Sequence, residues 1–226
     1  MYNFITGPLL WLSFIIFFGG LAWRVVSYIR GLDWRLDRVA YRAHPKEGLK
    51  GALQSILHWL FPYGSHGWRA KPVYTLVFFV FHVGVVVVPL FLVGHAVILE
   101  ERWGIRWWPT IPMWLADTLT IGVIVSTVFI IIRRIGLPEV RILTTLYDYF
   151  LLALTVTPFV TGFVVVQRLG DYTFWLYVHI LSAELLLIFI PFTKLYHVVG
   201  FFLSRGQIGA DFGIKRAYKA KRGFAW

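Results

Sequence analysis

Four histidines in apolar stretches are the residues of this chain best suited to chemistry. His179 and His197 bound the segment HILSAELLLIFIPFTKLYH, and His82 and His95 lie in the apolar run 73–99. Neutral imidazole is the usual protein ligand of haem iron, and ionisable residues inside a membrane are rare and usually functional. Two helices with two histidines each therefore predict two b-type haems, each bound by two histidines.

The spacing within each pair predicts where the rings point. The eighteen residues from His179 to His197 make five turns of an ideal helix, so both imidazoles leave one face about 27 Å apart. The thirteen residues from His82 to His95 turn the second ring by roughly 140°. Pro89 lies between them, and proline can kink or rewind a helix. We expect a distortion near Pro89; without one, an assignment on this helix is wrong.

The composition indicates an integral membrane protein. Of 226 residues, 58% are hydrophobic, and the mean hydropathy is +0.71. The absence of cysteine excludes covalent c-type haem attachment, cysteine-ligated clusters and disulfides within this chain. The net charge of +11 would suggest nucleic acid in a soluble protein, but here the basic residues lie in loops between apolar runs, so we expect no nucleic-acid partner.

The apolar runs predict an all-α membrane protein with a five-transmembrane-helix bundle. We find no internal repeat and no separate soluble region, so a single domain is expected over 1–226. A bilayer-spanning helix needs about 20 apolar residues. The expected spans are about 7–27, 73–99, 113–132, 142–166 and 174–203.

The distribution of Lys and Arg predicts the orientation. Basic residues follow the first span, separate the third from the fourth, and fill the tail: Arg24, Arg30, Arg35, Arg38, Arg42, Lys46, Lys50, Arg133, Arg134, Arg141, Lys215, Arg216, Lys219, Lys221 and Arg222. The positive-inside rule then places the N-terminus outside and the C-terminus in the cytoplasm. In that topology His95 pairs with His179 at the outer haem, and His82 with His197 at the inner one.

A shorter helical stripe precedes the second span. Residues 49–61 carry apolar side chains at helical spacing, and the stripe is too short to cross a bilayer. It is expected to lie along the membrane surface or against a partner. His44, His58 and His66 belong to this region, and no matching partner histidine is evident for them.

Other ionisable residues suggest quinone, proton and propionate contacts. Glu184 and Asp117 are the intramembrane carboxylates that could serve a quinone or a proton, and Lys194 could face an inner propionate or a quinone oxygen. Arg102, Arg106 and Arg168 are outer candidates for propionate pairing. Interfacial anchoring is the alternative for the basic residues, and a structural buried carboxyl is the alternative for Glu184 and Asp117.

These motifs resemble a known family. The five-span layout, FHVG at 81–84, VGH at 93–95 and the 179–197 segment are similar to the gamma subunit of respiratory nitrate reductase. Its relatives include the cytochrome b subunits of heterodisulfide reductase and of sulfate-reducer redox complexes, such as the high-molecular-weight cytochrome c complex. The resemblance implies that His82, His95, His179 and His197 bind two haems that exchange electrons with a menaquinone-type quinone. The spacing from His82 to His95 is wider than in the nitrate reductase gamma subunit. It favours the branch of the family that contains the heterodisulfide reductase and sulfate-reducer subunits.

That branch implies partners and a place in the cell. They are a cytoplasmic iron-sulfur subunit resembling heterodisulfide reductase, a periplasmic multihaem cytochrome c, and further membrane subunits. The expected protein is a multi-pass electron-transfer subunit of a quinone-linked oxidoreductase complex in a bacterial or archaeal cytoplasmic membrane. The alternatives are a haem-free membrane anchor and a proton or solute transporter that uses the intramembrane histidines and carboxylates.

Overall fold

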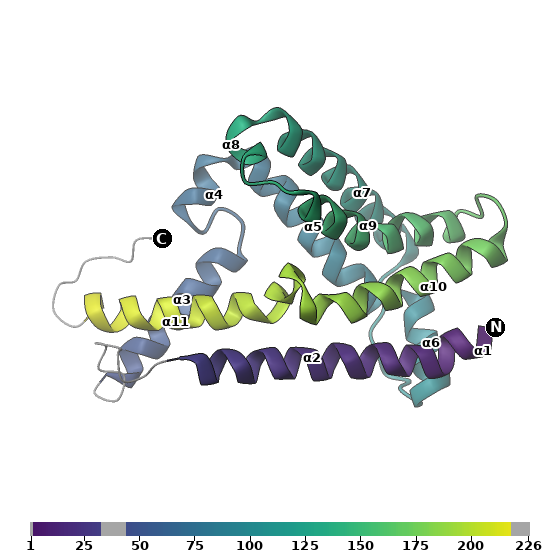
Figure 1. Cartoon of the computed structure of the whole chain (residues 1–226), viewed down its shortest axis with the longest axis horizontal. Coiled ribbons are helices and arrows are strands. Elements are labelled where there is room, and N and C mark those ends of the chain that lie inside the picture. The colour runs from purple at the N-terminus through teal and green to yellow at the C-terminus, as the bar shows by residue number, and fades with distance from the viewer. Residues whose placement is uncertain (1, 33–43, 218–226) are drawn as a thin grey trace. The chain divides into compact units, whose positions relative to one another are not determined.

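The computed structural model describes residues 2–32 and 44–217, which form helices joined by turns, with no strand among them (Figure 1). Five of the described helices are long and apolar enough to cross a membrane: Tyr2–Gly31, Pro72–Phe91, Met113–Gly136, Leu146–Val166 and Tyr172–Phe192. The chain is therefore an all-helical, multi-pass membrane protein. Six of the basic residues used for the orientation lie outside the described residues: Arg35, Arg38, Arg42, Lys219, Lys221 and Arg222.

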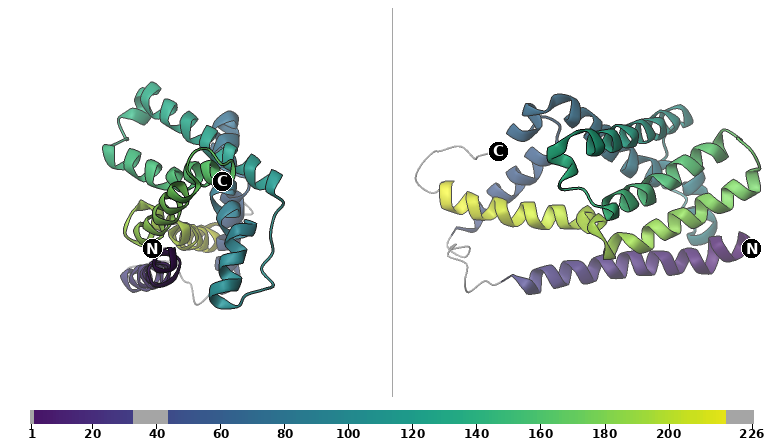
Figure 2. Two further views of the ribbon diagram at one scale, coloured as in Figure 1. Left: turned by 90° about the vertical axis from the view of Figure 1, so that its right-hand side faces the viewer. Right: turned by 45° about the horizontal axis from the view of Figure 1, so that its top comes forward.

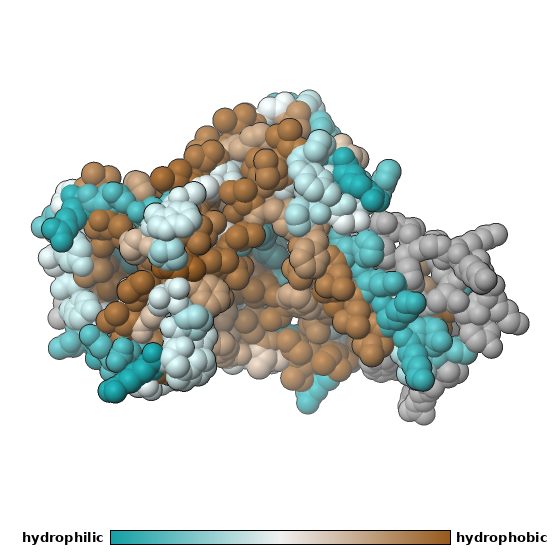
Figure 3. All heavy atoms as spheres, turned by 180° about the vertical axis from the view of Figure 1, so that it is seen from behind, coloured by the Kyte–Doolittle hydropathy of each residue, from teal (hydrophilic) through white to brown (hydrophobic). Residues whose placement is uncertain are grey.

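Apolar side chains on the surfaces of these helices support that class. Ile15, Val125 and Ile132 expose 64%, 61% and 63% of their surface. Figure 3 shows broad brown areas of such residues on the face that it draws. Water would not tolerate this much exposed apolar surface, whereas the hydrocarbon core of a bilayer would cover it.

The chain divides into two compact units, and each is described by itself. The first unit comprises 1–14 and 76–188, and the second comprises 15–75 and 189–226. The expectation of a single domain over 1–226 stays a prediction.

Three spans build the core of the first unit. They are α5 (Pro72–Phe91), α7 (Met113–Gly136) and α9 (Leu146–Val166). α7 and α9 lie side by side and are connected through the short α8 (Pro138–Arg141) (Figures 1 and 2). The buried apolar side chains at the centre of this unit are Phe81, Val88, Val123 and Phe159.

α9 begins four residues later than the expected start at 142. Thr145 has extended backbone angles, and its N–H donates to the Asp148 carboxylate at 2.9 Å in a capping box. Thr145 thereby ends the preceding turn and starts the helix. The capping role explains why an acidic residue, Asp148, lies in the first turn of this apolar span.

The distortion expected near Pro89 is confirmed. α5 ends at Phe91, Leu92 has an extended ψ of 134°, and α6 (Val93–Trp103) begins anew. A broken helix leaves carbonyl groups without their usual N–H partners. Here the Phe91 carbonyl accepts the N–H of Ile111, and the Leu90 carbonyl accepts the indole N–H of Trp108. The loop after α6 thus stabilises the break.

The expected continuous helix over 174–203 is wrong. The chain forms α10 (Tyr172–Phe189), two short 3-10 helices, η2 (Ile190–Phe192) and η3 (Lys194–Tyr196), and then α11 (His197–Ala217). Figure 2 shows this interruption before α11.

Pro191 and Thr193 explain the interruption. Pro191 has no N–H to donate to the preceding turn, and Thr193 has extended angles (φ −119°, ψ −177°). Thr193 then caps η3 by accepting the N–H of Leu195 at 3.2 Å. Because the helix is not continuous, the five-turn reasoning that placed His179 and His197 on one face does not hold.

In the second unit, α2 (Leu10–Gly31) stabilises this interruption. The Arg24 side chain donates through Nε to the Pro191 carbonyl at 2.7 Å, and its guanidinium lies 5.1 Å from the centroid of the Tyr196 ring. Gly20 allows the close approach, because a Cβ there would lie 2.6 Å from the Pro191 Cβ. A charged donor on a free carbonyl is among the stronger protein hydrogen bonds.

α3 (Pro45–Leu60) forms the other main contact of the second unit, with α11. This helix includes the expected stripe at 49–61 except for its last residue, Phe61, which has extended backbone angles. Gly51 of α3 meets Gly209 of α11 so closely that a side chain on either would overlap the other backbone. Gly213 lies against Glu47, so the two helices run antiparallel. Small residues allow backbones to come this close.

Candidate functional site

The clearest relationship between functional side chains joins His95 on α6 to His179 on α10, both in the first unit. The centroids of the two imidazole rings are 6.1 Å apart, and the ring planes differ by only 7°. The two residues are 84 positions apart in the sequence. The fold therefore brings together the pair expected at the outer haem.

His95 is held by the helix break that precedes it. Its Nδ1 is 2.8 Å from the Pro89 carbonyl, and since a carbonyl only accepts, Nδ1 is the donor. Loss of hydration lowers the pKa of His95, against a smaller opposite effect of that hydrogen bond. The ring is therefore neutral at pH 7, which is the form that binds metals. α6, which carries His95, is not one of the five helices long and apolar enough to cross a membrane.

His179 is held against α9. Its Nδ1 donates to the Pro158 carbonyl at 2.9 Å and lies 3.4 Å from the Thr161 hydroxyl. Gly162 makes room for the ring, because a Cβ at this position would lie 3.0 Å from His179 Cε1. A carbonyl oxygen has two lone pairs, so Pro158 can accept this bond in addition to others.

The two rings have features that would suit a pair of metal ligands. In both, Nδ1 donates to a backbone carbonyl, and neither Nε2 has a hydrogen-bond partner within residues 2–32 and 44–217. Metal-binding histidines commonly use one ring nitrogen for such an orienting bond and the other for the metal. The midpoint lies about 3 Å from each centroid, which accommodates a metal–nitrogen bond of about 2 Å plus the radius of an imidazole. The residues fit a haem iron between them.

Within residues 2–32 and 44–217, no larger ligand cluster competes with this pair. Among the described residues, no group of three or more His, Asp or Glu side chains is placed to hold a metal ion. A bis-histidine haem needs only two protein ligands, since the porphyrin supplies the rest. The observed pair is therefore of the right size for haem and too small for a typical zinc or di-iron centre.

The two histidines predicted to bind the inner haem show the same local arrangement. His82 places Nδ1 2.8 Å from the Phe78 carbonyl, and His197 places Nδ1 3.0 Å from the Lys194 carbonyl. All four histidines thus use the same ring nitrogen on the backbone. His82 belongs to the first unit and His197 to the second, so their pairing stays a prediction.

The two intramembrane carboxylates differ in their surroundings. Glu184 on α10 is only 3% exposed, and within the described chain neither carboxylate oxygen has a hydrogen-bond partner. Asp117 on α7 is half-buried and accepts a hydrogen bond from the Gln167 amide at 3.3 Å. Glu184 is thus the carboxyl with unused hydrogen-bonding capacity.

Two of the three arginines expected on the outer side have partners within the protein. Arg102 donates to the Thr6 hydroxyl at 2.7 Å, and Arg106 forms an exposed ion pair with Glu100 at 3.4 Å. Arg168 lies in the turn after α9 with a left-handed φ of 53°. The structure gives Arg102 and Arg106 local structural roles, and their contact with a propionate stays a prediction, as it does for Arg168.

Lys194 and the remaining histidines lie in the second unit. Lys194 is exposed in η3, three residues before His197. His44 precedes α3, and His58 donates to the Gln54 carbonyl of its own helix at 2.7 Å. His66 begins α4 (His66–Ala70) and is exposed. None of these three histidines adds to a metal-binding group in the described chain.

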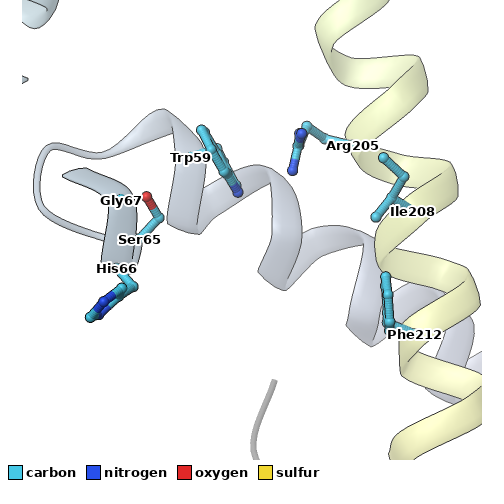
Figure 4. Close-up of a pocket in the computed structure, with 7 residues that line it drawn as sticks. All are labelled: Trp59, Ser65, His66, Gly67, Arg205, Ile208 and Phe212. Carbon is cyan, nitrogen blue, oxygen red and sulfur yellow. The ribbon is translucent and has the colours of Figure 1, made fainter. Parts of the chain in front are cut away.

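A small cavity of about 250 Å³ lies between α3, α4 and α11 (Figure 4). The guanidinium of Arg205 lies 4.3 Å from the centroid of the Trp59 ring on one side of it. The other lining residues are Ser65, His66, Gly67, Ile208 and Phe212. The cation–aromatic contact joins α3 to α11 and explains both residues structurally.

Sequence reasoning missed the α9 residues that hold His179. In the sequence, nothing distinguishes any one of these three residues from the rest of an apolar span: Pro158, Thr161 and Gly162. The available signal was their clustering within five residues of such a span, since proline and glycine there mark places where another group comes close to the backbone.

The fold and this site define a multi-pass helical membrane protein with a paired-histidine centre. The chain is 58% identical over 228 residues to a protein of Nitratidesulfovibrio vulgaris (strain Hildenborough) described only as "Protein", and the match covers all of both chains. The chain therefore belongs to the same family as that protein. No family model and no solved structure matches the chain.

Proposed function

We propose that this protein is a dihaem cytochrome b subunit that carries electrons through the membrane. The observation that carries the proposal is the His95 and His179 pair, with rings 6.1 Å apart and each Nδ1 on a backbone carbonyl. His82 and His197, each with the same Nδ1 bond, are proposed to hold the second haem. When bound, haem supplies one-electron transfer.

The residues around the outer pair perform identifiable tasks in this proposal. The Pro89 and Pro158 carbonyls fix the tautomer of each ring, because an Nδ1–H donor leaves Nε2 with a lone pair for iron. Gly162 leaves the space that the His179 ring occupies. The break at Leu92 turns His95 away from the direction that a regular helix would give it.

The proposed orientation has the N-terminus outside and the C-terminus in the cytoplasm of a bacterial or archaeal cell. It rests on the basic residues after the first span and in the tail. In that orientation the His95 pair is the outer site. A basic inner surface suits an acidic partner, and the family resemblance suggests a cytoplasmic iron-sulfur subunit, with a periplasmic multihaem cytochrome c outside.

Exchange with a menaquinone-type quinone is proposed to involve Glu184. A quinone needs an apolar slot, hydrogen-bonding partners and a group that transfers protons. Glu184 is a buried carboxyl without a hydrogen-bond partner in the described chain, whereas Asp117 is bonded to Gln167. Glu184 is therefore the first choice for this role.

A spectrum of the purified protein separates this proposal from its alternatives. Dithionite reduction should give b-type absorption bands, and a pyridine haemochrome assay should give two haems per chain. A haem-free anchor or a transporter gives no such bands. Purified, correctly assembled protein without any porphyrin would refute the proposal.

A further inference from the structure

α3 has two faces of different character. Its small residues Gly48, Gly51 and Ser55 are buried against α11. Its leucines point away from that contact, with Leu49 63% exposed and Leu53 52% exposed. Leu57 and Leu60, 47% and 45% exposed, continue the same row by one and two further turns. α3 therefore has an apolar face, which we call the leucine face (Leu49, Leu53, Leu57 and Leu60). No described residue of the second unit covers this face.

Contacts within the second unit place α3 beside the end of the first span. α2 ends at Gly31, and Tyr28 in its last turn donates to the Gln207 side chain of α11. Gly209, two residues further along α11, is the point where Gly51 of α3 makes its closest approach. Because α2 is a membrane-crossing helix, its last turn marks the bilayer boundary, and α3 is fixed at that level.

The charges beside the leucine face suit a phospholipid surface. On a helical projection the four leucines centre on one direction, and Lys46 and Lys50 lie about 25° and 65° to one side of it. Both lysines are exposed. Lysines beside an apolar face can extend to phosphate groups while their stems stay on apolar surface. Each basic residue near an anionic leaflet adds to the electrostatic attraction between the helix and the lipid surface.

We propose that α3 is an interfacial membrane helix. Its leucine face lies in the boundary between headgroups and acyl chains, and Lys46 and Lys50 contact the phosphates of anionic lipids. The tight glycine contact with α11 holds the helix at this depth. A protein partner on the leucine face is the competing occupant, but the level of α3 at the end of a span favours lipid. This placement is independent of the haem sites.

The absence of native cysteine makes the test direct. Leu53→Cys and Leu60→Cys each provide one site for an environment-sensitive fluorophore in the full-length protein, and two sites guard against failure of one variant. The matched control is His58→Cys, since five residues turn His58 about 140° from Leu53 on the same helix. The labelled proteins are placed in nanodiscs of phosphatidylcholine with phosphatidylglycerol that contain a lipid-phase nitroxide quencher.

Labels at 53 and 60 should be quenched by the nitroxide lipid at least roughly twofold more than the label at 58, since the interface buries an apolar face by about 5–10 Å. Equal quenching at all three sites, with equal access to aqueous iodide, would overturn the proposal and favour a protein partner. Replacing both Lys46 and Lys50 with Gln should reduce the quenching at 53 in nanodiscs with phosphatidylglycerol and leave it unchanged in pure phosphatidylcholine. No difference between the two lipids would refute the role of the lysines.

Discussion

The imidazole rings of His95 and His179 lie 6.1 Å apart with nearly parallel planes, and each is oriented through Nδ1 by the carbonyl of a proline, Pro89 or Pro158. Prolines inside helices disturb the regular hydrogen-bond pattern near them. The two histidines thus use the backbone at irregular points of two membrane helices. This arrangement leaves Nε2 of each ring without a hydrogen-bond partner in the described chain, as the proposed haem iron requires.

Removing either ligand should remove one haem. His95→Ala and His179→Ala are each expected to lower the haem content from two to one per chain, because one imidazole alone does not hold a bis-histidine haem. The double variant should lose no more than either single one, since both histidines serve one site. Pyridine haemochrome assays measure this, and His58→Ala is the control that should keep two haems. Loss of both haems in the double variant would contradict the pairing.

Filling the space beside His179 should disturb the same site. Gly162→Val adds side-chain atoms where a Cβ alone would lie 3.0 Å from the ring, so His179 must move. Overpacking of this kind costs about 1–3 kcal/mol. One low-spin haem signal should be lost in electron paramagnetic resonance spectra. Gly136→Val is the control, because a Cβ at Gly136 meets nothing within 4 Å. Unchanged spectra for both variants would argue against the proposed ligand.

The bond from Arg24 to the Pro191 carbonyl should stabilise the chain before His197. Arg24→Gln is expected to lower the free energy of unfolding by about 1.5–3 kcal/mol, the usual range for a hydrogen bond to a charged group. Thermal unfolding followed by circular dichroism measures the loss. Arg30→Gln removes the same charge from an exposed position on the same helix and should have little effect. Equal losses in the two variants would show that charge, not this contact, matters.

The contact between α3 and α11 predicts opposite effects on stability for two glycine-to-alanine substitutions in α11. Gly209→Ala should destabilise the protein, because the added Cβ would lie 2.6 Å from the Ser55 Cβ and overlap the Gly51 carbonyl. Gly206→Ala, one turn away, meets only Ile56 at 3.9 Å. It should be neutral or stabilising by up to about 1 kcal/mol, since alanine favours helix over glycine. Denaturant unfolding measures the free energy of unfolding of both variants. A Gly209→Ala variant more stable than the wild type would contradict the observed packing.

Glu184→Gln tests the quinone proposal separately from haem binding. Glutamine keeps the size and hydrogen-bonding shape of the side chain and cannot transfer a proton in the same way. Reduction of the haems by a menaquinol analogue should slow about 10²-fold or more, the usual contribution of a general acid or base. The haem content should stay at two. Asp117→Asn is the comparison, with a smaller effect expected, and equal rates in wild type and Glu184→Gln would exclude Glu184 from this step.

The sequence predicted the features that depend on residues close together in the chain. Apolar length predicts the five spans, and Pro89 predicts the break before His95, because both depend on neighbouring residues alone. The row of leucines predicts the helix at 49–61, though not the glycine face that packs on α11.

The sequence was less informative where distant residues decide. Pro191 signals a break in the last span as clearly as Pro89 does in the second, yet the even spacing of His179 and His197 favoured a continuous helix. The break at Pro191 is stabilised by Arg24, which lies 167 positions earlier and which no local pattern connects to it. The same holds for Gly162 beside His179, since only the tertiary contact gives that glycine its purpose.

The most direct measurement is the haem count of the purified wild-type chain beside that of His179→Ala, made in one preparation series. Two b-type haems per wild-type chain and one in the variant are predicted, with the remaining haem still low-spin. A wild-type chain that folds into the membrane without porphyrin, or a variant that keeps both haems, would contradict the proposal that paired histidines hold haem in this protein.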